Sequence, residues 1–281
     1  MTTIRDTLWN SIRLEPFALA LLDTGPFQRL RYVRQLGLAH LVYPGASHSR
    51  FEHALGAYHL ARVAIGALGE RGELANIPPL EANLVRAAAL LHDIGHYPFS
   101  HALEESGVPH HEDVARPLIL DGDVGAILRR EFGADAPARI LAMIRGESTS
   151  PLAGLISGSV DLDKIEYLKR DARMCGVPYG EIDVDRLIHA LLLVDDPARG
   201  RLAIGVSEKG LSALESLLFA KYQMYRNVYW HHAVRSATAM YKRLVDNALR
   251  AGSLGAETLA RFTDEGLLHE LDARAPSPLL A

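Results

Sequence analysis

An apolar run that leads straight into two ionisable residues constrains this chain more than any other stretch. Residues 87–91 read Ala-Ala-Ala-Leu-Leu, and His92 and Asp93 follow them at once. The run is typical of a buried helix, so Asp93 is expected at the edge of a core. A buried carboxylate costs several kcal/mol unless a cation or strong hydrogen bonds compensate it. The sequence therefore predicts a positive partner for Asp93, and a divalent metal ion shared with His92 is a candidate.

A His-Asp pair alone is weak evidence, because most such pairs cap a helix or bind an arginine. Two further segments strengthen the metal interpretation. Upstream, Ser49 suits the N-cap of a helix that carries His53 in its first turn. Downstream, residues 160–171 are predicted to form a helix in which one face carries residues 160, 163, 164, 167, 168 and 171.

Several blocks in a fixed order carry a resemblance to a known family: residues 23–32, 45–53, 91–101, 111–112 and 161–171. Together they resemble the HD-domain phosphohydrolase superfamily, and more narrowly its deoxynucleoside-triphosphate triphosphohydrolases. The resemblance covers roughly residues 5–250. It implies an all-α fold, an HD-domain helical bundle with at most a small β-ribbon.

The metal set of this family is a histidine, then an adjacent His-Asp pair, then a distant aspartate. The resemblance therefore implies one site for a divalent ion, with the ligands His53, His92, Asp93 and Asp163. The native metal stays open among Fe, Mn, Mg, Zn, Co and Ni. Asp163 is chosen over Asp161 because residues two apart on a helix point about 200° apart, and only Asp163 shares the striped face. Asp161 is expected to cap the helix.

Histidines near this set are candidates for proton transfer, since the unperturbed pKa of imidazole lies near neutrality. With a glutamate that the resemblance favours, the catalytic candidates are His96, His101, His111 and Glu112. Arg50 and Lys164 are expected to place positive charge near the phosphates. The resemblance extends the substrate-binding set to Gln35, Arg50, Lys164, Tyr167, Asp171, Tyr225, Arg226 and Tyr229. Without that context, the aromatic residues at 225–229 indicate simple packing.

Helical periodicity and breaker residues divide the chain into predicted elements. Helices are expected at residues 16–22, 27–37, 49–69, 80–93, 98–106, 183–192 and 211–250, with one from 110 onward and two between 122 and 146. Residues 6–14 are expected to form a short hairpin or an extended segment, and residues 191–194 and 201–206 a small ribbon. Residues 1–250 are assigned to the HD-type domain. Residues 251–281 are assigned to a helical tail, either part of that domain or a small appendage.

Composition limits the class of protein. At 281 residues, with 48% hydrophobic and 23% charged residues, the chain resembles soluble globular proteins. It has no leader-like opening and no run near the roughly 20 apolar residues of a membrane span, and its one cysteine, Cys175, agrees with a reducing compartment. A cytoplasmic protein without membrane contact is expected, and the resemblance adds a homo-oligomer. The formal net charge of -4 disfavours nonspecific nucleic-acid binding without excluding it.

The leading hypothesis is a metal-dependent phosphohydrolase that takes a nucleotide substrate and converts deoxynucleoside triphosphates to deoxynucleoside and triphosphate. A nucleotidase and a nucleotide pyrophosphohydrolase are alternatives within the superfamily. A zincin-like peptidase is suggested by the four-residue spacing of His92 and His96, but Asp93 is too short for the usual glutamate base and Gly95 disfavours a continuous helix. A non-catalytic HD module that senses nucleotides or nucleic acid is the alternative of another class. The sequence leaves base preference and control by effectors open.

Overall fold

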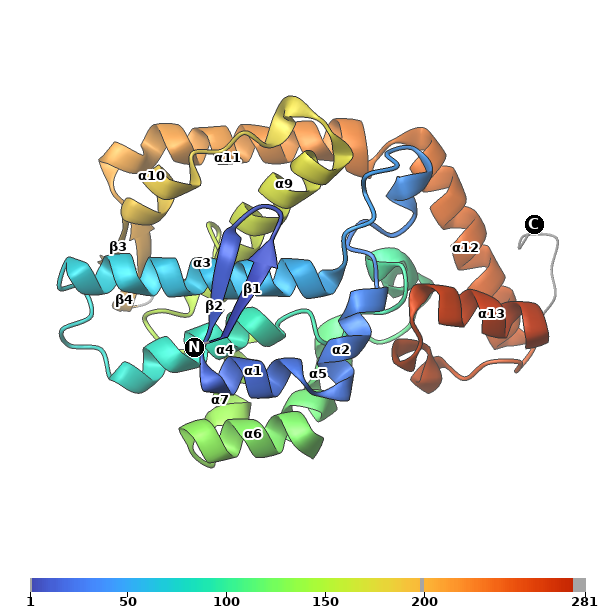
Figure 1. The fold of residues 1–281 in the computed structure, drawn as a ribbon, viewed down its shortest axis with the longest axis horizontal. Coiled ribbons are helices and arrows are strands. Elements are labelled where there is room, and N and C mark those ends of the chain that lie inside the picture. The colour runs from blue at the N-terminus through green and yellow to red at the C-terminus, as the bar shows by residue number, and fades with distance from the viewer. Residues whose placement is uncertain (1, 198–199, 275–281) are drawn as a thin grey trace.

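The helix expected after Ser49 is α3 (Arg50–Glu70), which runs across the middle of the molecule in Figure 1. Its start is fixed locally, because the Glu52 carboxylate accepts a hydrogen bond from the Ser49 backbone N–H at 2.6 Å. This capping box satisfies N–H groups that have no partner inside the helix. The structure is a computed structural model that describes residues 2–197 and 200–274.

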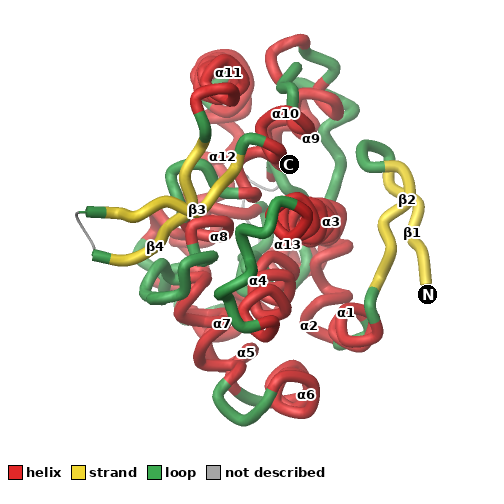
Figure 2. The backbone as a smooth tube through the Cα atoms, turned by 90° about the vertical axis from the view of Figure 1, so that its left-hand side faces the viewer, coloured by secondary structure: helices red, strands yellow, loops and turns green. Residues whose placement is uncertain are grey.

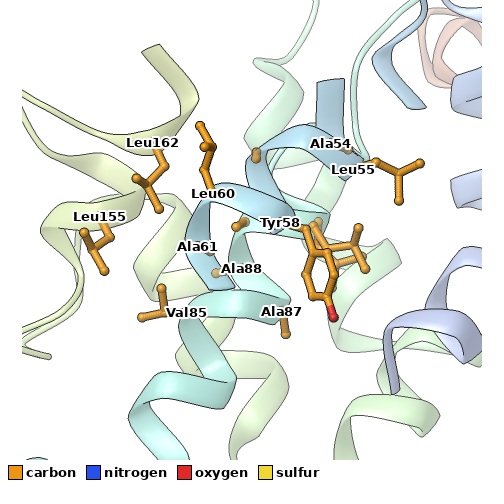
Figure 3. Close-up of a cluster of buried hydrophobic side chains, with 14 of the residues drawn as sticks. Ala54, Leu55, Tyr58, Leu60, Ala61, Val85, Ala87, Ala88, Leu155 and Leu162 are labelled. Carbon is orange, nitrogen blue, oxygen red and sulfur yellow. The ribbon is translucent and has the colours of Figure 1, made fainter. Parts of the chain in front are cut away.

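The helix α4 (Pro79–Leu91) packs along α3 and is the buried helix expected before His92. Figure 3 shows buried side chains of both helices in one cluster with Leu155 and Leu162. Ala87 and Ala88 of α4 are fully buried, and their small side chains let the two helices approach closely. A buried leucine contributes about 1.5–3 kcal/mol, so the leucines supply most of the stabilisation while the alanines set the distance.

The remaining helices surround this pair, with α9 and α11 on one side of α3 and α1 and α6 on the other in Figure 1. They are α1 (Pro16–Leu22), α2 (Gly25–Arg29), α5 (His111–Leu120), α6 (Gly122–Phe132), α7 (Ala136–Ile144), α8 (Gly154–Ser157), α9 (Leu162–Cys175), α10 (Val184–His189), α11 (Leu211–Met224), α12 (His232–Arg250) and α13 (Asp264–Arg274). Most of the helices expected from periodicity are therefore present.

Two antiparallel ribbons make up the sheet structure of the described residues. They are β1 (Thr2–Asp6) with β2 (Asn10–Leu14), and β3 (Leu191–Asp196) with β4 (Arg201–Val206). Figure 2 shows them on opposite sides of the helical body. The expected all-α fold with small ribbons is confirmed, and the N-terminal segment is the hairpin rather than a single extended strand.

The helix predicted at residues 27–37 is wrong beyond its first turns. The helix α2 has five residues and gives way to a short 3-10 turn. The reason is tertiary, because the Gln35 N–H donates to the His48 carbonyl oxygen at 3.0 Å and the Arg34 N–H donates to the Asp264 carboxylate at 3.0 Å. These acceptors come from distant segments, so the spacing of apolar residues does not reveal them.

The helix predicted at residues 98–106 is instead a 3-10 helix, Ser100–Ser106. Two residues with positive φ mark its start, since Phe99 just before it has φ 56° and its first residue, Ser100, has φ 62°. An α-helix cannot run through consecutive left-handed residues, so the chain turns sharply at this point. The correction bears on the site because His101 comes directly after these two residues.

The single helix predicted at residues 211–250 is interrupted. After α11, residues 225–229 form a π-helical turn, and α12 begins at His232. The Trp230 N–H donates to the Tyr225 carbonyl oxygen at 3.0 Å, a five-residue step that α-helical periodicity does not predict. Turns of this kind often occur at functional sites.

The expected C-terminal tail contains α13, and residues 275–281 lie outside the described residues. It is bonded to the first part of the chain, because Arg29 Nη1 donates to the Phe262 carbonyl oxygen at 3.0 Å. This contact favours a tail that belongs to the same domain, although the boundary at residue 250 stays a prediction. Within the described ranges, no helix combines the length and apolar character that crossing a bilayer requires.

Two glycines offer a test of this packing. Alanine at Gly95 is expected to destabilise the protein by about 1–3 kcal/mol, because its Cβ would overlap the His111 carbonyl oxygen and lie 2.6 Å from Ala115 N. Alanine at Gly66, on the exposed side of α3 with no atom nearby, should instead stabilise it by about 0.5–1 kcal/mol. Denaturant unfolding of both variants checks the opposite signs, and equal effects would contradict the close approach of α5.

Candidate active site

The four predicted metal ligands come together from three elements. His53 lies in the first turn of α3, His92 and Asp93 directly follow α4, and Asp163 lies in the first turn of α9. The His53 Nε2 atom is 3.0 Å from Asp163 Oδ1 and 3.4 Å from Asp93 Oδ2. The His92 Nε2 atom is 3.1 Å from His53 Nε2 and 3.5 Å from an oxygen of each aspartate. Donor atoms of His53, His92 and Asp93 all lie within 4.8 Å of one another, and Asp163 adds a carboxylate that faces both imidazoles.

The neighbouring Asp161 has a different function. Its Oδ1 atom accepts a hydrogen bond from the Lys164 backbone N–H at 2.9 Å, which makes it the N-cap of α9, as expected from the sequence. Its second oxygen bonds to Lys164 Nζ. Asp161 is therefore occupied at the helix start, while Asp163 faces the two histidines.

The charge balance of this cluster suits a cation. Asp93 is almost fully buried, and although burial alone would raise its pKa, Arg50 and the nearby histidines hold the pKa well below its usual range. Burial alone would lower the pKa of His53, but hydrogen bonds to Asp163 and Glu166 raise it to about 10. The carboxylates thus draw positive charge to this point. Nitrogen and oxygen donors in this number fit a divalent metal ion.

A second set of buried groups orients His53. Its Nδ1 atom lies 2.6 Å from Glu166 Oε2, the carboxylate-to-histidine contact that commonly orients a metal ligand. The other oxygen of Glu166 accepts from Trp9 Nε1 at 2.9 Å and from Arg170 Nε at 2.7 Å. Arg170 Nη1 in turn donates to Asp6 at 3.0 Å. The N-terminal hairpin therefore reaches the ligand cluster through this network.

The sequence prediction did not single out Glu166. The available indication was its position three residues after Asp163, which places both on one side of α9. Gly56 on α3 gives a second indication, because a Cβ at that position would overlap the Glu166 carboxylate. Small residues opposite a buried carboxylate mark such close approaches.

A group of histidines lies next to the ligands and shares one carboxylate. Glu104 is 3.0 Å from His101 Nδ1 and 2.5 Å from His111 Nδ1. The His96 Nε2 atom is 3.4 Å from His101 Nε2, and its Nδ1 atom is 3.2 Å from Asp93 Oδ1. Three of the predicted catalytic residues are thus brought together. Glu104 was not predicted, although its spacing of three residues from His101 was visible.

Burial affects the pKa of two members of this group, His96 and Glu104. Burial and the neighbouring Arg50 hold the pKa of His96 well below its usual range, so its imidazole is neutral at physiological pH. Burial alone would raise the pKa of Glu104, but the hydrogen bonds from His101 and His111 lower it. Glu104 is therefore negatively charged, and its two oxygens orient His101 and His111.

Two neighbouring cavities open at these groups. One, of about 290 Å³, is lined by three of the predicted ligands, His92, Asp93 and Asp163, and by all four catalytic candidates, His96, His101, His111 and Glu112. The other, of about 420 Å³, is lined by Asp171, Tyr225 and Tyr229 among others. Both are bordered by Gln35, Arg50, His101, Asp163 and Tyr167. The predicted substrate residues therefore lie mainly at these two cavities.

Some predicted substrate residues are placed differently. Lys164 and Arg226 lie outside the linings that the described residues form, since Lys164 is bonded to Asp161 and Arg226 is exposed beside Tyr222. Asp171 is almost fully buried and accepts a hydrogen bond from the Tyr229 hydroxyl at 2.8 Å. It also lies 2.8 Å from His48 Nε2. Asp171 therefore fixes the orientation of Tyr229 at the cavity wall.

The first turns of α12 add lining that the sequence prediction missed. Val234, Arg235 and Thr238 border the larger cavity. Their spacing fits one helix face, but the π-helical turn before α12 changes which face points inward. The interruption had to be known before these residues could be assigned.

Comparisons with known proteins agree with this geometry. The HD domain family model matches residues 50–174, which include all four predicted ligands, and the HD associated region model matches residues 182–278. This chain belongs to the HD-domain phosphohydrolase superfamily. The resemblance based on the sequence blocks is therefore confirmed.

Several relatives are similar over most of the chain. An uncharacterized protein of Methanocaldococcus jannaschii is 37% identical over 269 residues, which are 95% of this chain and 54% of the relative. The human deoxynucleoside triphosphate triphosphohydrolase SAMHD1 is 28% identical over 269 residues, 82% of this chain and 42% of that protein. The crystal structure of a hypothetical protein from Aquifex aeolicus matches with a TM-score of 0.84 and 34% identity, over 98% of this chain and 72% of that one. The chain spans about half the length of the curated relatives it matches.

The ligand assignment predicts opposite results for two neighbouring aspartates. Asp163→Ala should lose bound metal, because it removes a carboxylate that faces both His53 and His92. Asp161→Ala should keep the metal and lose the N-cap of α9, at a cost of about 1 kcal/mol. Metal analysis after dialysis against limiting Mn²⁺, together with thermal unfolding, checks both variants. Full occupancy in Asp163→Ala with loss in Asp161→Ala would reverse the assignment.

Proposed function

We propose that this chain is a metal-dependent phosphohydrolase that splits deoxynucleoside triphosphates into deoxynucleoside and triphosphate. The observation that carries the proposal is the junction of the two cavities at Arg50, His101 and Asp163. One cavity is lined by charged and polar side chains, among them three of the proposed ligands, as phosphates require. The other has aromatic walls, as a nucleoside requires. A substrate that spans both would place its α-phosphate at the junction.

His53, His92, Asp93 and Asp163 would hold the divalent ion. When bound, such an ion neutralises phosphoryl oxygens and supplies a water of lowered pKa. Arg50 adds a fixed positive charge, because its guanidinium is held by Asp93 and by the Ser100 hydroxyl, which lies 3.0 Å from Arg50 Nε. Lys164 can contribute only after leaving Asp161. The chain thus provides charge stabilisation before substrate arrives.

His101 is proposed to supply the proton in the reaction. When water attacks the α-phosphorus, the bond between that phosphorus and the 5′ oxygen breaks. The 5′ oxygen is a poor leaving group unless it is protonated. His101 lies at the junction of the cavities, and Glu104 holds its Nδ1 side, so Nε2, whose protein contact is His96 Nε2 at 3.4 Å, is the nitrogen proposed to act on the substrate. Neutral His96 and the His111–Glu112 pair are proposed to position the reacting groups.

Recognition of the sugar is proposed for the residues between the cavities. The Gln35 side chain is buried and borders both cavities, and its Oε1 atom has no hydrogen-bond partner among the described residues. This Oε1 atom can accept a hydrogen bond from a sugar hydroxyl. Tyr167 stands beside it and would crowd a 2′-hydroxyl, while Tyr225 and Tyr229, held by Asp171, would contact the nucleoside. The apolar lining favours relaxed base choice.

The names of relatives support this substrate class. Besides the human protein, the Dictyostelium discoideum SAMHD1 homolog, named a deoxynucleoside triphosphate triphosphohydrolase, is 32% identical over 253 residues, 84% of this chain and 47% of that protein. A homo-oligomer stays a proposal on family grounds, to be checked by light scattering with and without nucleotide.

The direct test is product identification. Protein loaded in turn with Mn²⁺, Fe²⁺, Co²⁺, Ni²⁺, Zn²⁺ or Mg²⁺ is incubated with dATP, dGTP, dCTP, TTP and ATP in ¹⁸O-water. We expect deoxynucleoside and ¹⁸O-labelled triphosphate, with kcat/KM for ATP clearly below that for dATP. Phosphate or pyrophosphate as the first product would favour a nucleotidase or pyrophosphohydrolase. Nucleotide binding without turnover would favour a sensor.

The proposed proton donor predicts a specific kinetic change. His101→Asn should lower kcat by about 100-fold or more with a smaller change in KM, because the lost interaction exists chiefly in the transition state. Glu104→Gln should give a smaller loss, since it removes only the orienting charge. His189→Asn, at an exposed histidine of α10, is the matched control and should change neither constant. Wild-type kcat in His101→Asn would reject this role.

A further inference from the structure

A buried carboxylate at the start of α13 is bonded to the segment that carries His101. Asp264 has no solvent exposure. Its Oδ1 atom accepts the Phe99 backbone N–H at 2.7 Å. Its Oδ2 atom accepts the Arg34 backbone N–H at 3.0 Å and Arg34 Nη1 at 3.3 Å. One side chain of the HD associated region therefore bonds two segments that border the proposed site.

The contact between Asp264 and Phe99 lies at two residues with an unfavourable backbone conformation. Phe99 and Ser100 both have positive φ, a conformation that non-glycine residues rarely adopt. Such a pair persists only where surrounding contacts enforce it. Asp264 holds the first residue, and the Ser100 hydroxyl, which donates to the Arg34 carbonyl oxygen at 2.6 Å, holds the second.

Functional groups on both sides depend on this turn. The Ser100 hydroxyl accepts a hydrogen bond from Arg50 Nε, and Arg50 Nη1 in turn donates to the Asp93 carboxylate. The next residue along the chain is His101. A relaxed turn would therefore move the proposed proton donor and loosen Arg50, while His53 and Asp163 stay on their helices.

A partly buried arginine, Arg29, connects the same tail to the preceding turn. Arg29 Nη2 donates to the His96 carbonyl oxygen at 2.6 Å, and Nη1 donates to the Phe262 carbonyl oxygen at 3.0 Å. The tail is thus connected to the histidine segment twice, directly through Asp264 and indirectly through Arg29, which bridges Phe262 and His96. The arrangement is more than a single incidental hydrogen bond.

We propose that Asp264 is a positioning residue, through which the C-terminal region sets the conformation of Phe99–Ser100 and so places His101 and Arg50 for turnover. The proposal rests on the proposed function for the role of His101. It assigns the tail a part in catalysis without contact with substrate or metal. Occupancy of the metal site should not depend on it.

The kinetic test compares neighbouring acidic residues that both contact Arg34. Asp264→Asn, which keeps the shape and one acceptor oxygen, and Asp264→Ala are measured beside Glu265→Gln, an exposed residue 2.5 Å from Arg34 Nη2. We expect kcat on dATP to fall about 100-fold in Asp264→Ala and less in Asp264→Asn, with KM changed less and Mn²⁺ content at the wild-type level. Glu265→Gln should match the wild type. Unchanged kcat in a folded Asp264→Ala, or parallel loss of metal, would overturn the proposal.

Two readouts separate positioning from general destabilisation. In a His101→Asn background, Asp264→Ala should lower kcat by a clearly smaller factor than in the wild-type background, because the contribution through His101 is already removed and only that through Arg50 remains. A full multiplicative loss would indicate an independent effect and reject the proposal. Hydrogen exchange of the Phe99 amide should become at least tenfold faster in both Asp264 variants and stay unchanged in Glu265→Gln.

The exchange readout also separates failure of this proposal from failure of the proposed function. If the wild-type protein shows no nucleotide hydrolysis, the proposed function fails, while faster exchange at Phe99 would still support the structural role of Asp264. If hydrolysis occurs but Phe99 exchange does not change in either Asp264 variant, the positioning role is wrong.

Discussion

The burial of one carboxylate, that of Asp93, is the constraint on which the arrangement of this protein depends. A buried charge of this kind is tolerated only with cationic partners and hydrogen bonds. Arg50 and His53 come from α3, His92 from the end of α4, and His96 from the turn beyond it. Each partner requires its own element at close range. The meeting of α3, α4 and the histidine turn can therefore be understood as the compensation of a single charge.

Helices can approach one another this closely only where the residues between them are small. The alanines of α4 bring that helix against α3, and Gly56 leaves space that the Glu166 carboxylate fills beside His53. Gly95 lets α5 approach the turn after Asp93, which brings His111 to Glu104. Packing and electrostatics are thus coupled, because a single added methyl group at either glycine would displace a charged group from its partner.

The features that could be predicted from the sequence depend on neighbours in the chain. The Ser49 N-cap, the Asp161 N-cap and the ribbon at 191–206 follow from local spacing, and the ligand set followed from family resemblance. The failures have a common physical origin. The backbone near Arg34 bonds to Asp264, and the turn at Phe99 does the same. Such partners, 165 or more residues away, decide local conformation and leave no local pattern.

The site therefore combines two kinds of support. The predicted metal ligands stand on or next to regular helices, whose own hydrogen bonds fix their backbone, so they need little from the rest of the chain. His101 stands after two left-handed residues in a 3-10 segment, which has no comparable internal support. Its position must be imposed by Arg34, Arg50 and Asp264, which lie far apart in the sequence. If Asp264 has the proposed positioning role, the proposed metal ligands come from the HD domain, whereas the geometry of turnover would depend on the associated C-terminal region.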